Sequence, residues 1–196
     1  LVVAHLDVEA LGKSFDAPEA ERREAARHLA DAVGEMTALA RRLATIGRDE
    51  GAGRAEEIDV AGLVRDIFAF ASRHRGVRPM RLHLEAGEAI VQRSHPELLR
   101  RALLNLMLNA AQAAEPGGQI LVRLRAEGDA AVLEVHDDGP GVPEAQRSAI
   151  FDPFVSARGD GAGLGLLAVK ACAEAHGARV EVDRSPILGG ACFRIA

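Results

Sequence analysis

Large aromatic side chains are scarce in this sequence of 196 residues, which contains no tryptophan, no tyrosine and six phenylalanines. Proteins that bind single-stranded nucleic acids stack bases on such side chains, so this mode of binding is not expected. An excess of basic residues is absent as well, because 24 lysines and arginines stand against 29 aspartates and glutamates and the formal net charge is −5. A basic surface is the usual signature of nucleic-acid binding, and we therefore expect no nucleic acid among the partners.

Cysteines and long apolar runs are also few. Cys172 and Cys192 are the only thiols, and in a chain long enough to bury an ordinary core they favour reduced cytoplasmic cysteines over a disulfide. No apolar run approaches the roughly 18 residues of a membrane-spanning helix, so we expect a cytoplasmic fragment without membrane contact. The chain starts at Leu1 and stops within a predicted strand, so we expect a piece of a longer protein. The sequence leaves open whether that parent is membrane-anchored.

Residues 1–48 carry the pattern of two amphipathic helices. Apolar residues recur at spacings of three and four from Leu1 to Phe15 and again from Ala26 to Leu43, which is a heptad-like seam. Two helices cannot bury stripes this wide against each other, so the sequence predicts a helical hairpin that dimerises into a four-helix bundle. A hairpin packed on its own chain's second domain is the alternative.

A polar linker at residues 49–57 separates this hairpin from a second domain at residues 58–196. There, helical periodicity is seen at residues 60–74, 100–118 and 163–176, with a short helix at residues 143–151, and Ser94 with Glu97 fits a capping box before the second of these helices. Strands are predicted at residues 80–86, 89–93, 119–127, 130–138, 178–184 and 191–196, the third and fourth forming a hairpin. The fold class is therefore α+β, with an α/β sandwich whose helices cover one face of a largely antiparallel sheet.

A polar stripe interrupts the apolar helix at residues 100–118. Asn105, Asn109 and Gln112 are spaced i, i+4 and i+7, which places them on one helix face. A buried carboxamide without a partner costs about 1–3 kcal/mol. The stripe therefore raises the question of what partner it serves.

Two glycine-rich stretches could supply a ligand site. In "HDDGPGVP" (His136–Pro143), two acids at a strand end precede glycines that allow close backbone approach, although a tight turn with a solvated Asp pair would look the same. In "GDGAGLGL" (Gly159–Leu166), glycines open directly into a helix whose N-terminus favours an anion such as phosphate, a flexible hinge being the alternative. This second stretch is neither a P-loop nor a Rossmann fingerprint. Between the two, "IFDPFVSARG" (Ile150–Gly159) sets two phenylalanines three apart, either to staple a loop to the core or to anchor a mobile lid.

The order of these stretches resembles the sensor histidine kinases of two-component signalling. The resemblance supplies an N box (Asn105 to Asn109), a G1 box (Asp137 to Gly141), an F box (Phe151 to Phe154) and a G2 box (Gly161 to Gly165). It implies a GHKL (Bergerat) ATP-binding domain after a dimerisation and phosphotransfer hairpin. "NAAQAA" is most similar to the nitrogen-regulation-type branch.

The resemblance also implies roles for individual residues. Asp137 would bind the adenine amine, Asn109 would offer an oxygen to Mg²⁺, and Asn105 would contact phosphate or the water shell of the ion. Arg158 would supply a cation where the neutral Gln112 replaces the basic residue of many relatives. The remaining expected ATP-binding positions are Gly139, Gly141, Phe151, Phe154, Gly161, Gly163, Leu164, Gly165 and Leu166. The expected cofactors are therefore ATP and Mg²⁺.

The related gyrase- and chaperone-type ATPases keep a glutamate where this chain has Asn105. A carboxamide cannot take a proton at neutral pH, so fast ATP hydrolysis is not expected, and phosphoryl transfer to a histidine is. The acceptor histidine of the family would lie upstream of Leu1, and His5 has the character of a surface histidine. No cluster of histidines and cysteines has zinc spacing.

The expected function is thus the catalytic core of a homodimeric, ATP-dependent protein-histidine kinase. It would autophosphorylate on histidine and pass the phosphoryl group to an aspartate in the receiver domain of a response regulator. The alternative is a nucleotide-binding dimerisation or phosphatase module without its own acceptor histidine. A serine kinase of the same nucleotide fold is a weaker option, because the long hairpin argues against it.

Overall fold

The computed structural model describes residues 54–196 except residues 129, 154 and 156–164. The predicted helical hairpin and most of the predicted linker lie outside these residues. The described part begins with β1 (Glu56–Asp59), which pairs antiparallel with β3 (Val91–Ser94) in a two-stranded sheet. This first strand was not predicted, and it begins within the segment that the sequence indicated as linker.

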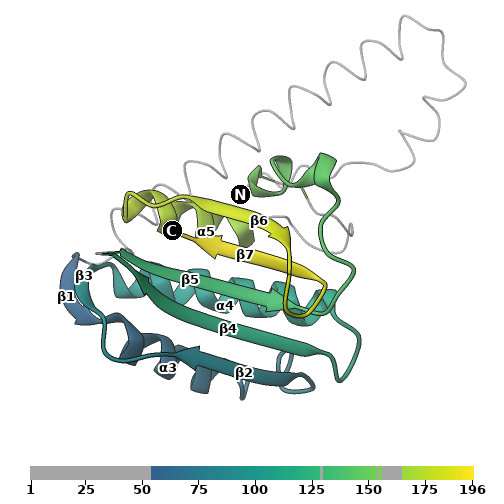
Figure 1. The fold of residues 1–196 in the computed structure, drawn as a ribbon, viewed down its shortest axis with the longest axis horizontal. Helices are drawn as coiled ribbons and strands as arrows, with labels where there is room; N and C mark the ends of the chain where they lie inside the picture. Colours follow the sequence, from purple (N-terminus) through teal and green to yellow (C-terminus); the bar gives the residue numbers. More distant parts are fainter. Residues whose placement is uncertain (1–53, 129, 154, 156–164) are drawn as a thin grey trace, which may run out of the picture. The chain divides into compact units, whose positions relative to one another are not determined.

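The main element is a five-stranded sheet in the order β2-β4-β5-β7-β6 (Figure 1). Its strands are β2 (Arg81–Ala86), β4 (Gln119–Glu127), β5 (Ala130–Asp137), β6 (Val180–Arg184) and β7 (Ala191–Ile195). Strand β2 runs parallel to β4, and the other neighbours are antiparallel. The predicted hairpin of β4 and β5 is confirmed, with Ile120 opposite Asp137.

Three helices cover one face of this sheet, as predicted: α3 (Val60–Ala71), α4 (Pro96–Ala113) and α5 (Gly165–Ala175) (Figure 1). Helix α4 lies between the other two and is buried through Leu103, Leu106 and Met107, which are all 0% exposed. Burial of side chains of this size contributes about 1.5–3 kcal/mol each, so the apolar face of α4 holds the two layers together. The short helix predicted at residues 143–151 is instead two 3₁₀ turns, η1 (Glu144–Gln146) and η2 (Ala149–Phe151).

The start of α4 differs from the predicted capping box. His95 is the N-cap and forms no side-chain capping bond. Its N–H instead donates to Nε2 of His176, 3.0 Å away, and Ser94 Oγ lies 2.8 Å from the same nitrogen. His176 Nδ1 donates to the carbonyl oxygen of Cys172 at 2.7 Å, which fixes the neutral tautomer of the ring. His176, directly after α5, thus supplies the hydrogen-bond acceptor at the start of α4, in place of the predicted capping box.

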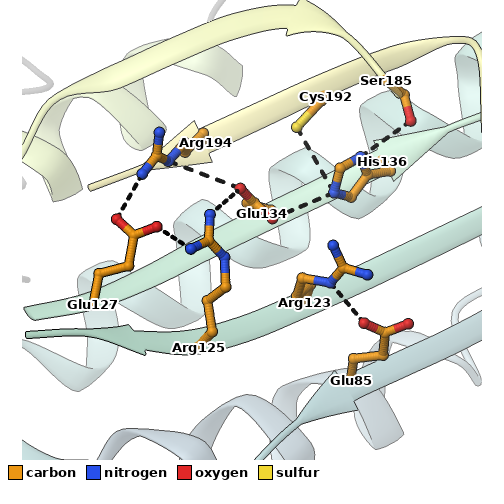
Figure 2. Close-up of polar contacts among 9 residues, drawn as sticks. All are labelled: Glu85, Arg123, Arg125, Glu127, Glu134, His136, Ser185, Cys192 and Arg194. Atoms are coloured by element: carbon orange, nitrogen blue, oxygen red, sulfur yellow. Dashed lines mark hydrogen bonds and ion pairs between the residues drawn. The ribbon is translucent and has the colours of Figure 1, made fainter. Parts of the chain in front are cut away.

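The other face of the sheet carries a row of alternating charges. In register across the five strands lie Glu85, Arg123, Glu134, Arg194 and Glu181. Arg123 Nε is 2.6 Å from Glu85 Oε2, and Arg125 Nη2 is 3.0 Å from Glu134 Oε1 (Figure 2). Opposite charges on neighbouring strands attract one another, and each acid of the row stands beside an arginine.

Cys172 and Cys192 are both buried and free, as predicted. Burial raises the pKa of the Cys172 thiol to about 12 and that of Cys192 to about 11, so both remain protonated and unreactive near neutral pH. In the part of the chain that the structure describes, no helix is long and apolar enough to cross a membrane.

We predict that His176→Ala lowers the free energy of unfolding of the chain by about 1–3 kcal/mol, because the His95 N–H and the buried Ser94 hydroxyl lose their acceptor. Urea denaturation measures this loss. The control is His83→Ala, which removes an exposed histidine of β2 and is expected to change stability by less than about 0.5 kcal/mol. Equal losses in the two variants would contradict a capping role for His176.

Candidate functional site

The polar stripe on α4 is the first component of the site. Asn105 and Asn109 are partly buried and Gln112 is exposed, whereas Leu106, Met107 and Ala110 of the same helix are buried. None of the described residues forms a hydrogen bond with these three carboxamides. Within the described part of the chain, the stripe therefore offers three carboxamides whose donors and acceptors are unused, which is the property expected of a ligand-binding surface.

The beginning of α5 lies beside this stripe. A Cβ atom built on Gly165 would lie 3.5 Å from Asn105 Oδ1. The first residue of α5, at the end of the glycine-rich stretch, is thus a neighbour of the first amide of the stripe. Because backbone N–H groups at a helix N-terminus favour anions, the two segments can share one anionic ligand.

Asp137 is the second component, at the end of β5. It is 2% exposed, and its Oδ1 accepts the N–H of Gly139 at 2.9 Å and the N–H of Ala191 at 3.0 Å. Its backbone carbonyl accepts the N–H of Gly190 at 3.0 Å. Two donors on one oxygen fix the plane of the carboxylate, as a group that recognises a ligand by hydrogen bonding requires.

The turn after Asp137 packs against the end of α4. A Cβ atom on Gly139 would lie 2.8 Å from the carbonyl oxygen of Ala113, so only glycine allows this approach. Gly141 has a φ of +77°, in the left-handed region that glycine adopts without strain. These contacts bring Asp137 and the polar stripe to the same region of the molecule.

Asp138 adds an unsatisfied acceptor to this region. Its Oδ1 is buried and has no hydrogen-bond partner among the described residues. A Cβ atom on Gly118 would lie 2.6 Å from this oxygen, so the start of β4 packs tightly against it. Buried acceptors without a partner are rare in folded proteins and are typical of places that a ligand or water completes.

Phe151 occupies a different environment. It is 8% exposed and packs edge-on against Phe193 of β7, with ring centroids 6.3 Å apart. It therefore anchors its segment to the core, and Leu166 is likewise packed against the core. The other predicted positions here, namely Phe154, Arg158, Gly161, Gly163 and Leu164, lie outside the described residues.

The turn between β6 and β7 also contributes to the site, and this was not predicted from the sequence. The N–H of Gly190 donates to the backbone carbonyl of Asp137, and the N–H of Ala191, which is 54 positions away, donates to its carboxylate. A Cβ atom on Gly190 would collide with the carboxylate and carbonyl of Asp137 and with the N–H of Gly139. The paired glycines at positions 189 and 190 were the available signal, because such a pair before a strand marks a turn or a close approach.

Comparison with known proteins decides the family. Residues 94–196, which contain the stripe, both glycine-rich stretches and the β6–β7 turn, match the family model described as histidine kinase-, DNA gyrase B- and HSP90-like ATPase. The chain belongs to this family. The curated relatives that match include sensor kinases, and the domain is a histidine kinase ATPase domain.

Curated relatives of this ATPase domain come from several bacteria. Sensor protein kinase PilS of Pseudomonas aeruginosa is 37% identical over 138 residues, covering 68% of this chain and 26% of the relative. Histidine-protein kinase/phosphatase MprB of Mycobacterium sp. (strain KMS) is 34% identical over 176 residues, covering 85% of this chain and 34% of the relative. The chain thus spans about a quarter to a third of the length of these relatives.

Solved structures of histidine kinases share the fold of the domain. A mycobacterial sensor histidine kinase MprB has a TM-score of 0.64 and 28% identity over 72% of this chain and 95% of the other. Full-length ShkA in complex with AMPPNP has a TM-score of 0.62 and 26% identity over 93% of this chain and 40% of the other. The predicted GHKL-type α/β sandwich is therefore confirmed.

We predict that Gly190→Ala destabilises the ATPase domain by about 1–3 kcal/mol, because the added methyl group must displace Asp137 or the turn that follows it. Thermal unfolding followed by circular dichroism measures the effect. Gly87→Ala is the matched control, since a Cβ there meets nothing within 4 Å, and it should stay within about 0.5 kcal/mol of the parent. An unchanged unfolding temperature for Gly190→Ala would contradict the prediction, because the turn would then accommodate the methyl group without loss of stability.

Proposed function

We propose that this chain is the catalytic core of a two-component sensor histidine kinase. It autophosphorylates a histidine at the expense of ATP and donates the phosphoryl group to an aspartate of a response-regulator receiver domain. The observation that carries this proposal is the meeting of three segments at one place: the Asn105–Asn109 stripe, the start of α5 at Gly165, and the fixed Asp137 carboxylate.

The residues at this site fit ATP and Mg²⁺. Asp137 receives the adenine amine, and Asn109 supplies an amide oxygen to Mg²⁺, a cation that prefers oxygen ligands. Asn105 and Gln112 contact the phosphates or the waters of the ion, with Arg158 as the additional cation. We propose that backbone N–H groups at Gly161, Gly163 and Gly165 bind the triphosphate. Asp138 Oδ1, which has no partner among the described residues, supports a ligand at this position. The nucleotide supplies the transferable phosphoryl group.

The identity of Asn105 favours a kinase over a hydrolase. A hydrolase needs a base that activates water, and a carboxamide cannot take that proton. Transfer to a histidine imidazole needs mainly positioning and charge neutralisation from the nucleotide domain. The site therefore holds the nucleotide and leaves the nucleophile to another segment.

The remaining features follow from the family resemblance of the sequence. Residues 1–48 form the dimerisation hairpin, residues 49–57 the linker and residues 58–196 the ATP-binding domain. The chain works in the cytoplasm as a homodimer, and the acceptor histidine lies upstream of Leu1. The "NAAQAA" stretch supports the nitrogen-regulation-type branch.

A second candidate is a nucleotide-binding dimerisation or phosphatase module. It is supported by the name of one relative, MprB, which is described as a kinase/phosphatase. In this case the domain binds ATP, but its parent protein carries no acceptor histidine and forms no phosphohistidine of its own.

We predict that Asn109→Ala weakens Mg-ATP binding at least about tenfold, because the ion loses a direct oxygen ligand. Isothermal titration calorimetry measures the affinity. Circular dichroism and urea denaturation should show an unchanged fold, since alanine favours a helix. Arg100→Ala on the same helix is the control, because among the described residues Arg100 forms only a surface ion pair with Glu97, and this variant should keep the affinity of the parent. If Asn109→Ala unfolds the domain, the stripe is structural.

The second experiment separates the two candidate functions. We expect the full-length protein, incubated with γ-labelled Mg-ATP, to become labelled, and the label to be lost in acid and kept in base, as for phosphohistidine. Asn109→Ala in the full-length protein should abolish the label. An acid-stable label would contradict a histidine kinase, and ATP binding without any label would favour the second candidate.

A further inference from the structure

The turn that holds Asp137 is itself held by Ser185. Ser185 donates its N–H to the carbonyl of Gly190 at 2.8 Å and accepts the N–H of Gly189 at 3.0 Å. Its hydroxyl oxygen accepts the N–H of Leu188 at 2.9 Å and the N–H of Ile187 at 3.3 Å. Ser185 is 3% exposed, so water does not replace these bonds easily. The conformation that places Gly190 and Ala191 on Asp137 thus depends on this one residue.

The neighbour of Ser185 on the sheet is His136. Their Oγ and Nδ1 atoms are 3.1 Å apart, and His136 is 2% exposed (Figure 2). A serine hydroxyl has two acceptor positions and one donor, and both acceptor positions are occupied by turn N–H groups. Ser185 must therefore donate to His136 Nδ1, and the neutral imidazole carries its proton on Nε2. That nitrogen lies 3.6 Å from Glu134 Oε2 and 3.8 Å from Cys192 Sγ.

The surroundings of His136 favour this neutral form. Burial lowers the pKa of His136, although Glu134 on the same strand acts in the opposite direction. Arg123 on β4 also lowers it, and Glu85 on β2 raises it slightly. Burial raises the pKa of Glu134, but the hydrogen bond and charge of Arg125, together with His136, outweigh this effect and lower the pKa overall, so the carboxyl group stays ionised. Cys192 on β7 remains a neutral thiol.

His136 and Asp137 are consecutive residues on opposite faces of β5. The histidine faces the charged row, and the aspartate lies at the candidate nucleotide site. A path of hydrogen bonds connects them, from His136 to Ser185, through the β6–β7 turn, and back to Asp137.

We propose that His136 and Ser185 are positioning residues for Asp137: the Ser185–His136 hydrogen bond fixes the β6–β7 turn, and the turn fixes the carboxylate that selects adenine. This inference rests on the proposed adenine contact of Asp137. Its consequence is that loss of the bond lowers the preference for ATP over GTP, because a carboxylate in several orientations no longer matches the adenine amine better than the guanine carbonyl.

Two substitutions remove the bond and one retains it. Ser185→Ala removes the donor and His136→Leu removes the acceptor, whereas His136→Asn keeps an acceptor oxygen near the position of Nδ1. We expect Ser185→Ala and His136→Leu each to lower the ratio of ATP to GTP affinity about fivefold to tenfold, as for one hydrogen bond, and the double variant to add little. His136→Asn should stay within about twofold of the parent. Calorimetric titration with Mg-ATP and Mg-GTP measures the ratio.

Val132→Ala is the matched control. Val132 is 1% exposed and lies on the same strand and face as His136, so its truncation lowers stability without breaking the path. The ATP to GTP ratio should not change in this variant. If the ratio falls in Val132→Ala as much as in Ser185→Ala, the effect of Ser185→Ala comes from lost stability alone, and the proposal is overturned.

Two further measurements test the hydrogen-bond path in the absence of nucleotide. The ¹⁵N shifts of His136 should show the proton on Nε2, and amide hydrogen exchange at Ala191 should be faster in Ser185→Ala but not in His136→Asn. A proton on Nδ1, or unchanged exchange, would overturn the path itself. If these readouts hold but the parent chain binds neither nucleotide, the proposed function fails and the positioning role fails with it. If the parent prefers ATP and the variants do too, only the positioning role fails.

The path also predicts a pH dependence. Protonated His136 presents an N–H at Nδ1, which Ser185 cannot accept while it holds both turn N–H groups. Since the pKa of His136 is lowered in the folded state, the unfolded chain binds more protons, and the associated stability is present above about pH 6.5 and falls as the pH drops below it. The ATP to GTP ratio of the folded protein should fall at lower pH, as the pH drops through the lowered folded-state pKa of His136. The difference between the parent and His136→Asn isolates His136 from His176 and the other histidines, and identical profiles would contradict the proposal.

Discussion

The buried Asp137 carboxylate joins three segments that are distant in sequence, and the geometry of the site depends on it. Its Oδ1 accepts hydrogen bonds from Gly139, in the turn that packs on the end of α4, and from Ala191, at the start of β7. A charge at 2% exposure is tolerated only when it is hydrogen-bonded. The requirement to satisfy this carboxylate therefore constrains the β5 turn, the β6–β7 turn and the end of α4 together, and it explains why glycine stands at positions 139 and 190.

The two faces of the five-stranded sheet differ in packing and in charge. The inner face, with Leu133 and Val135 of β5, packs against the helices that carry the candidate site. The outer face is an alternating row of acids and arginines that attract one another across the strands. Individual exposed ion pairs contribute little, but Arg125 and His136 together lower the pKa of Glu134 and keep it ionised. The strand β5 connects the faces, since alternate residues point to opposite sides.

Local patterns were sufficient for most of the elements and for the order of the motifs. Helical periodicity identified α3, α4 and α5, and alternation identified β4, β5 and the last two strands. Local rules failed where a distant residue intervened. The predicted capping box is absent because His176, which lies 81 positions from His95, supplies the acceptor. Strand β1 was missed because its polar sequence is held by pairing with β3 rather than by a pattern of its own. The predicted short helix at residues 143–151 lacks the length for a stable α-helix and forms two 3₁₀ turns.

The sequence by itself determined the α+β class of the ATP-binding domain, the polar stripe of Asn105, Asn109 and Gln112, and the acid at the end of β5, because each depends on spacing along one segment. Only the tertiary structure decided which groups form hydrogen bonds with the buried polar side chains. Ala191 reaches Asp137 across 54 positions, and Ser185 reaches His136 across 49. Such bonds depend on strand order and register, which bring β5 beside β7, and no local spacing encodes them. The partners of buried polar groups are therefore a property of the folded sheet.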